Sequence, residues 1–132
     1  MTPFTLEKTV LKEHLDELNH VNNIQYLVWV QEVAKAHWEA LTASTETSFH
    51  NWVVRSHHIE YKQAALLGDQ INLRTYVAKS KGALSERIVE IVLKNEERVL
   101  AKCSTQWCYI NKNTGRPEPL SESLLKLFSK EL

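Results

Sequence analysis

The sequence predicts an α+β fold in which a curved antiparallel sheet wraps around one long central helix. Residues 24–41 form a single long apolar segment whose large side chains recur at helical spacing. Four β-rich segments then follow with short connections, an order that favours an antiparallel meander packed on that helix. The 132 residues suffice for a sizeable core, and we expect a single domain over residues 1–132.

The first half of the chain predicts a strand and then the helix. Residues 4–12 alternate imperfectly between apolar and polar side chains, which indicates an opening strand. The helix should begin near Asn22 or Asn23, because the side-chain oxygen of either residue can cap its first turn. A Ser/Thr-rich loop, residues 42–47, should end it.

The second half changes to the period of strands. The predicted strands are residues 52–61, 70–78, 84–93 and 99–110. Turns are expected at Lys81 and Gly82 and at Asn95 and Glu96, and the last strand should end near Gly115. Residues 120–128 then predict a short amphipathic helix that Ser121 caps.

Composition excludes several classes of partner. The chain has 16 basic and 16 acidic residues, so no basic field predicts binding to nucleic acid or to a membrane surface. The N-terminus has no apolar segment after a basic start, and no apolar run reaches the length of a membrane span. We therefore expect a cytoplasmic protein. Cys103 and Cys108 have odd spacing on one predicted strand, so they should point to opposite faces and remain free thiols.

Familiar motifs for cofactors and metals are absent from the sequence. His14 and His20 do not form an H-E-x-x-H helix, and the two cysteines lack CxxC spacing. There is also no Gly-rich phosphate loop and no G-x-S-x-G elbow. The sequence thus predicts neither a metal nor a cofactor.

The polar run D-E-L-N-H-V-N-N, residues 16–23, stands directly before the predicted helix. It places a carboxylate, Asp16, close to the backbone N–H groups of a helix N-terminus. A carboxylate can act as a base or a nucleophile, and free N–H groups at the positive end of a helix can stabilise an oxyanion. Both are what acyl chemistry needs. Asp16 could instead simply cap a turn.

Three stretches resemble the hotdog-fold acyl-CoA thioesterases, and specifically their 4-hydroxybenzoyl-CoA thioesterase-like branch. The family has an Asp, then Gly-His-Val-Asn-Asn, then a Tyr in the first helical turn. It also has Tyr-x-x-Pro-Ala-x-x-Gly-Asp, and a Thr-Gly-Arg-Pro-type exit before the last helix. The matching residues are Asp16, His20, Val21, Asn22, Asn23 and Tyr26; Tyr61, Ala65, Gly68 and Asp69; and residues 114–120.

Two positions depart from the family pattern. Asn19 stands where the family has Gly, and Asn tolerates a positive φ less well than Gly but better than most residues. Ala64 stands where the family has Pro, which should loosen a turn without affecting chemistry.

The resemblance implies hydrolysis of an acyl-CoA thioester to the free acid and CoA. In that role Asp16 is the base or the nucleophile, which the sequence does not distinguish, and the N–H of Asn23 polarises the thioester carbonyl. His20 either orients the carbonyl or the Asp, or holds the loop through a backbone hydrogen bond. Asn22 should fasten the loop to the helix or contact the substrate, and Tyr26 should pack and line the acyl pocket.

Other polar residues receive secondary roles. Lys79, Lys81 and Gly82 form a predicted hairpin tip that in relatives lies near the ligand, so Lys81 and Gly82 are candidates to bind CoA. Glu32 on the helix should make an interface or a salt bridge. His57 and His58 are adjacent on a strand and should face opposite ways.

The expected substrate is a thioester of CoA or of acyl carrier protein. Because an open sheet has edges that invite pairing with a second copy, we expect a homodimer or a homotetramer with the site at the interface. Two alternatives stay open at this point. One is an acyl-thioester hydratase or dehydratase, although the sequence lacks the H-x-x-x-x-P-G-type signature of such relatives. The other is a non-catalytic acyl-CoA-binding module.

Overall fold

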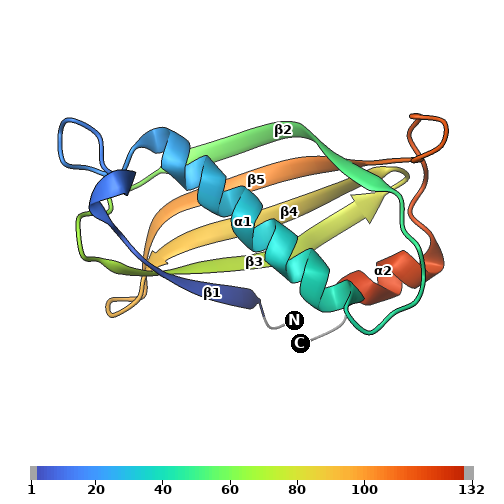
Figure 1. The fold of residues 1–132 in the computed structure, drawn as a ribbon, viewed down its shortest axis with the longest axis horizontal. Coiled ribbons are helices and arrows are strands. Elements are labelled where there is room, and N and C mark those ends of the chain that lie inside the picture. Colours follow the sequence, from blue (N-terminus) through green and yellow to red (C-terminus); the bar gives the residue numbers. More distant parts are fainter. Residues whose placement is uncertain (1–2, 130–132) are drawn as a thin grey trace.

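The structure, a computed structural model, describes residues 3–129. The elements are β1 (Phe4–Thr9), η1 (Lys12–His14), α1 (Asn23–Thr42), β2 (Asn51–Tyr61), β3 (Gln70–Lys81), β4 (Leu84–Leu93), β5 (Arg98–Ile110) and α2 (Glu122–Phe128). Figure 1 shows α1 running across the sheet, with α2 beside its C-terminal end.

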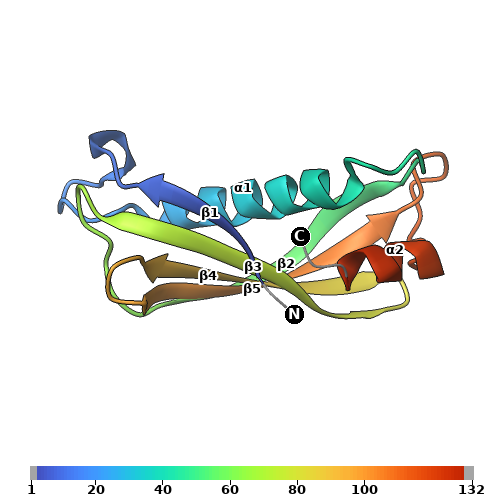
Figure 2. The same cartoon turned by 90° about the horizontal axis from the view of Figure 1, so that it is seen from below.

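The five strands form one antiparallel sheet in the order β1-β3-β4-β5-β2. Seen edge-on, the sheet curves around α1, which covers one of its faces (Figure 2). The predicted architecture is therefore confirmed.

Most predicted boundaries hold, and the misses have physical reasons. β4 has the bounds that the sequence predicts, because turn residues flank it on both sides. β1 ends at Thr9, since Val10 turns into the core and the chain continues as η1. β3 runs on to Lys81 because its ladder with β4 continues to the pair of Lys81 and Leu84.

The core lies between α1 and the concave face of the sheet. Tyr26, Trp29, Val30 and Val33 of α1 are almost fully buried there. Their partners on the central strands are Ile71, Leu73, Val89, Ile91, Ala101 and Cys103. A second cluster joins Leu41, Val77, Tyr109, Leu124 and Phe128. Burying these side chains stabilises the helix on the sheet by roughly 1.5–3 kcal/mol each.

Local signals work as the sequence predicts at several points. Ser121 caps α2, because its hydroxyl accepts the N–H of Leu124 at 3.2 Å. Gly82 has a φ of 61° in the turn between β3 and β4. Cys103 and Cys108 are both buried free thiols.

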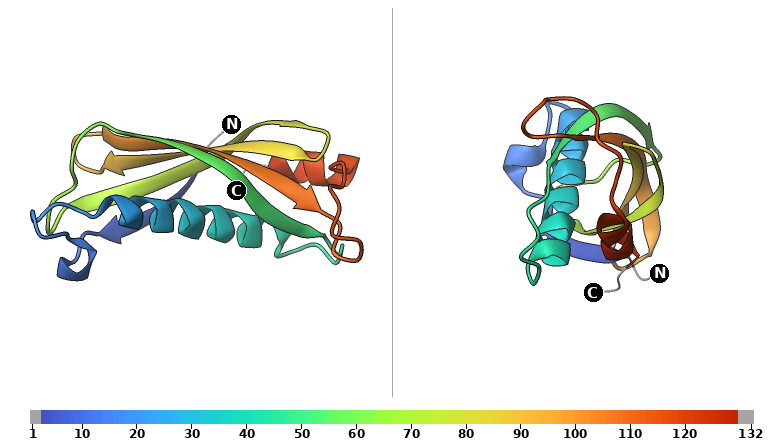
Figure 3. Two further views of the ribbon diagram at one scale, coloured as in Figure 1. Left: turned by 90° about the horizontal axis from the view of Figure 1, so that it is seen from above. Right: turned by 90° about the vertical axis from the view of Figure 1, so that its right-hand side faces the viewer.

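The two outer strands of the sheet are β1 and β2. β2 has eleven residues, and none of them is fully buried. It forms one margin of the sheet, and α1 lies in the layer beside the sheet (Figure 3). A long edge strand offers unpaired N–H and C=O groups along its open side. Neither described helix combines the length and hydropathy that crossing a bilayer would require.

Candidate active site

The polar run before α1 folds into a closed loop. Leu15 and Val21 form an isolated antiparallel bridge, and the N–H of Asp16 donates to the carbonyl oxygen of His20 at 2.8 Å. The loop therefore brings Asp16 back beside the residues that begin the helix.

One oxygen of the Asp16 carboxylate holds this loop. Oδ1 accepts the N–H of Leu18 at 2.9 Å and the N–H of His20 at 3.2 Å. Oδ2 accepts no hydrogen bond from residues 3–129, and the side chain is half-buried. The carboxylate thus caps a turn with one oxygen and leaves the other available for chemistry.

Asn19 takes the conformation that the family pattern reserves for Gly. Its φ is 61°, in the left-handed region that costs most L-residues about 1–2 kcal/mol and that Asn visits more readily. Its N–H donates to the Asp16 carbonyl oxygen at 3.1 Å. The loop therefore keeps its shape without the Gly.

The start of α1 leaves one backbone donor free. Asn22 caps the helix, and its Oδ1 accepts the N–H of Ile24 at 2.9 Å. The N–H of Asn22 donates to the carbonyl oxygen of His14 at 2.9 Å, so Asn22 fastens the loop to the helix. The N–H of Asn23 donates to no acceptor within residues 3–129. Asn23 is an exposed residue, and its N–H lies at the positive end of a 20-residue helix.

The second sequence motif, residues 61–69, makes hydrogen bonds that hold the first motif, residues 16–26, in place. The N–H of Ala65 donates to the Tyr26 hydroxyl oxygen at 2.9 Å, and the carbonyl oxygen of Ala65 accepts the N–H of Val21 at 3.1 Å. The Tyr61 hydroxyl donates to the carbonyl oxygen of Asn23 at 3.2 Å. Tyr26 is 2% exposed and is not among the residues that line the groove described next, so its visible role is to position this backbone.

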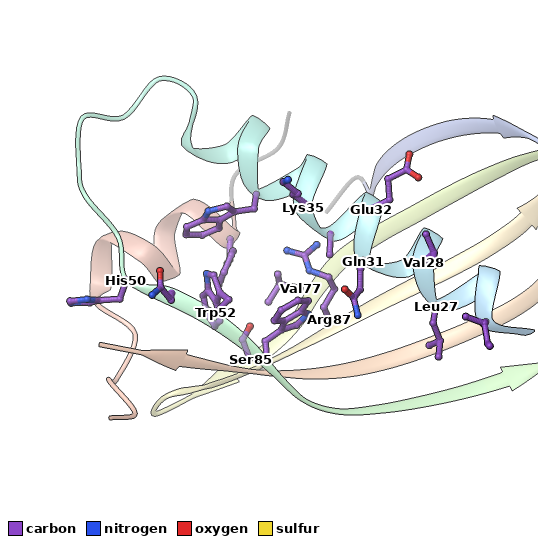
Figure 4. Close-up of a pocket in the computed structure, with 16 residues that line it drawn as sticks. Leu27, Val28, Gln31, Glu32, Lys35, His50, Trp52, Val77, Ser85 and Arg87 are labelled. Atoms are coloured by element: carbon purple, nitrogen blue, oxygen red, sulfur yellow. The ribbon is translucent and has the colours of Figure 1, made fainter. Parts of the chain in front are cut away.

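A groove of about 860 Å³ runs between α1 and β2, within the range of small-molecule sites. It begins beside the free N–H, because Ile24 is one of its lining residues. Figure 4 shows Leu27, Gln31 and Trp52 around it. Trp38, Trp107 and Phe128 add further aromatic surface to its wall.

One charged side chain is buried in the wall of this groove. Arg87 on β4 is 5% exposed, and its Nη1 donates to Nδ1 of His37 at 2.8 Å and to the Thr75 hydroxyl at 3.0 Å. Burial lowers the pKa of Arg87 to about 10, so the guanidinium stays charged at neutral pH. Burial and then the nearby Arg87 charge lower the pKa of His37 to about 4. His37 is therefore a neutral acceptor.

The remaining predicted residues lie in different places. His20 is exposed and holds the loop through its backbone, the second of its two predicted roles. Lys81 ends β3 and Gly82 is in the β3–β4 turn, which lies at the opposite end of the sheet from the loop before α1 (Figures 1 and 3), so one chain does not bring them to this loop. Glu32 forms the predicted salt bridge, with Lys8 at 2.8 Å.

The pair of histidines on β2 divides as predicted. His57 is half-buried with Nδ1 2.7 Å from the Thr105 hydroxyl, while His58 is exposed beside Glu60. Burial lowers the pKa of His57 and raises the pKa of the neighbouring Cys103. That thiol is therefore a poor nucleophile. Within residues 3–129, no three His, Cys, Asp or Glu side chains gather into a metal site.

Comparison with known proteins identifies the family. The sequence pattern of the thioesterase-like superfamily matches residues 10–128. The chain belongs to this superfamily. The predictions of a hotdog fold and of a thioester hydrolase are thereby confirmed, while the 4-hydroxybenzoyl-CoA thioesterase-like branch stays a prediction.

Individual relatives agree with this assignment. The long-chain acyl-CoA thioesterase FadM of Escherichia coli (strain K12) is 28% identical over 116 residues, which are 84% of this chain and 86% of FadM. The structure of YbaW, a probable thioesterase from Escherichia coli, has a TM-score of 0.82 at 24% identity, covering 96% and 98% of the two chains. That of SAV2348 from Staphylococcus aureus, in complex with CoA, has a TM-score of 0.85 at 18% identity, covering 96% and 82%. The last two likenesses show the fold.

Sequence reasoning about this thioesterase missed the side chains in the wall of the groove. Arg87, Val89 and Ile91 are two residues apart on β4, so their side chains lie on the same face of the strand. This spacing is a signal in the sequence that Arg87 faces the core. Its contact with His37, 50 residues earlier, depends on how α1 crosses the sheet.

Proposed function

We propose that this thioesterase hydrolyses long-chain acyl-CoA thioesters to the free acid and CoA. The Asp16 carboxylate acts as general base or nucleophile, the N–H of Asn23 donates to the thioester oxygen, and the acyl chain lies in the groove along α1. Asn22 and His20 support the loop. The alternative substrate is the same thioester carried by acyl carrier protein, and a cytoplasmic location stays a prediction from the sequence.

The observation that carries the proposal is the pairing of a free acceptor with a free donor. Oδ2 of Asp16 and the N–H of Asn23 both lack partners among the described residues, on a loop whose own hydrogen bonds fix its shape. A carboxylate that must activate water or attack a carbonyl needs one unengaged oxygen. A developing oxyanion needs a donor that is already oriented.

The groove supports the choice of substrate. It starts at Ile24, next to the free N–H, and continues along α1 to Trp38. Fourteen residues of helix span about 21 Å, long enough for an extended fatty acyl chain. FadM acts on long-chain acyl-CoA and SAV2348 binds CoA, which agrees with this assignment.

A second copy of the chain completes the proposed assembly. The groove is bordered by β2, the edge strand with an open side, and by the apolar side chains of Ile24 and Val28, which are 70% and 51% exposed. A homodimer or homotetramer that pairs along this edge would cover these side chains. Lys81 and Gly82 would then contact CoA only if a second subunit brings them near the loop of the first.

The test is a thiol-release assay with CoA thioesters of increasing acyl length. Asp16→Asn should lower kcat by about 10²–10⁴-fold, since it removes the base or nucleophile. The fold should survive, because the carboxamide oxygen can still accept the N–H groups of Leu18 and His20. The matched control is Glu17→Gln, which neutralises the adjacent exposed carboxylate and should change kcat by less than twofold.

Three results would contradict the proposal. Undiminished turnover by Asp16→Asn would exclude the role of Asp16. Tight binding of acyl-CoA by the unaltered protein without thiol release would instead favour an acyl-CoA-binding module. Hydration of an enoyl thioester under the same conditions would favour a hydratase.

A further inference from the structure

The Arg87 guanidinium is a buried positive charge without a negative partner. Its two recorded contacts, Nδ1 of His37 and the Thr75 hydroxyl, are both neutral at pH 7. No carboxylate oxygen of residues 3–129 comes within 4.0 Å of it. The neighbouring Glu86 points its carboxylate to Ser104 instead, at 2.9 Å.

Such a charge is costly unless something compensates it. Moving a guanidinium out of water is unfavourable, and two neutral hydrogen-bond acceptors offset only part of that cost. Nη1 serves both contacts, so Nε and Nη2 donate no hydrogen bond to residues 3–129. Neither nitrogen is among the side-chain atoms that are buried without a partner. Both nitrogens therefore retain some solvent exposure, and Arg87 is part of the groove lining.

The position of Arg87 along the groove sets a length scale. Figure 4 shows its guanidinium under α1, near the level of Gln31 and Lys35. Its partner His37 is fourteen residues from Asn23, and Gln31 is eight, so the charge lies about 12–21 Å along the helix from the free N–H. An extended chain of roughly 9–16 carbons spans that distance, because C–C bonds of about 1.5 Å advance less than their length along a zigzag.

We propose that Arg87 binds a carboxylate at the far end of the acyl chain, so that the preferred substrates are CoA monothioesters of dicarboxylic acids. The proposal rests on the proposed function for the orientation of the chain, with its thioester at Asn23. The free Nε and Nη2 edge offers the two parallel donors that a carboxylate accepts. The substrate supplies the missing negative charge, and the apolar walls contact the methylene groups between its two ends.

The test compares matched pairs of substrates in the full-length protein. For each chain length from about 8 to 16 carbons, kcat/KM is measured for the ω-carboxyacyl-CoA and for the methyl-terminated acyl-CoA. The unaltered protein should favour the ω-carboxyacyl-CoA at one or more lengths. In Arg87→Met the ratio of the two kcat/KM values should fall about 10- to 100-fold. The ratio is taken within one variant, so a reduced folded fraction does not affect it.

Lys35→Met is the control for charge alone. Lys35 is an exposed cation of the same groove, and screening by water should limit its effect on the ratio to less than threefold. Arg87→Lys keeps the charge but loses the two-pronged donor geometry, so its ratio should lie between those of the unaltered protein and Arg87→Met.

A binding measurement separates this proposal from the hydrolytic one. Calorimetric titration of both substrate types into Asp16→Asn reports the preference whether or not the unaltered protein cleaves thioesters. A preference for the ω-carboxyacyl-CoA that Arg87→Met removes supports the proposal even without turnover. A preference of the unaltered protein for the methyl-terminated partner at every length overturns it, and so does an equal loss of ratio in Lys35→Met and Arg87→Met.

Discussion

The buried histidine of the groove makes folding stability depend on pH in a predictable way. His37 is 5% exposed, and its pKa is about 4 in the folded protein against 6.5 for an ordinary histidine. Between these values the unfolded chain binds a proton that the folded one does not, so stability falls as pH falls. The contribution is fully present above pH 6.5 and is lost as pH falls through 4.

The magnitude follows from the two pKa values. A shift of 2.5 units corresponds to about 3.4 kcal/mol in total, and about 2 kcal/mol of it disappears between pH 7.5 and pH 5. His37→Asn should remove this part of the pH dependence, because its side-chain oxygen can accept the Arg87 N–H but does not titrate. His58→Asn is the matched control, since His58 is exposed and should leave the pH dependence unchanged.

Urea unfolding at pH 7.5, 6 and 5 measures these free energies, at one fixed protein concentration because an oligomer gains stability by mass action. Carboxylates titrate alike in all three proteins, so the difference between His37→Asn and the unaltered protein isolates the histidine. If His37→Asn loses as much stability as the unaltered protein between pH 7.5 and pH 5, the assignment of a neutral, buried His37 is refuted.

Two further predictions concern the loop and the edge strand. Asn19→Ala should lower the free energy of unfolding by about 1 kcal/mol, because the φ of 61° strains Ala. Asn19→Gly should change it by only a few tenths of a kcal/mol, because the same φ suits Gly. Equal urea midpoints of the two variants would contradict this. Val53→Lys, on the open edge strand β2, should weaken self-association at least tenfold in sedimentation equilibrium, while Thr5→Lys on the other edge strand, β1, should not. A monomeric parent protein, or equal effects of the two changes, would contradict the proposed interface.

Local signals predicted the elements well wherever the deciding interaction is local. The cap at Asn22 and the turn at Gly82 involve neighbours within three residues, so the sequence alone specifies them. The sequence predicts the end of β3 three residues too early, because pairing with β4 rather than intrinsic propensity carries that strand on to Lys81. Propensity becomes a weak guide when a partner strand supplies the hydrogen bonds.

The candidate site shows the same difference between local and long-range interactions. Asp16 and Asn23 belong to one short segment, so the motif alone indicates that they share the loop and the helix start. Arg87 could not be connected with His37, because a helix crossing a curved sheet decides which side chains meet. A charged residue on the inner face of a strand is a local conflict with the fold. Such conflicts persist where function compensates them, which is why the position of Arg87 is informative.

The helix itself should act as a ruler for the substrate. The free N–H of Asn23 and the His37 partner of Arg87 are part of one rigid 20-residue helix, so the distance between the two binding points cannot adapt easily to a different chain. An ω-carboxylate that falls short of Arg87 would be left in an apolar groove without a partner, which is costly. A chain that is too long must bend against aromatic walls. The preference for dicarboxylic monothioesters should therefore peak at one length rather than rise steadily with carbon number, and a flat dependence on length would mean that the carboxylate stays in water and never reaches Arg87.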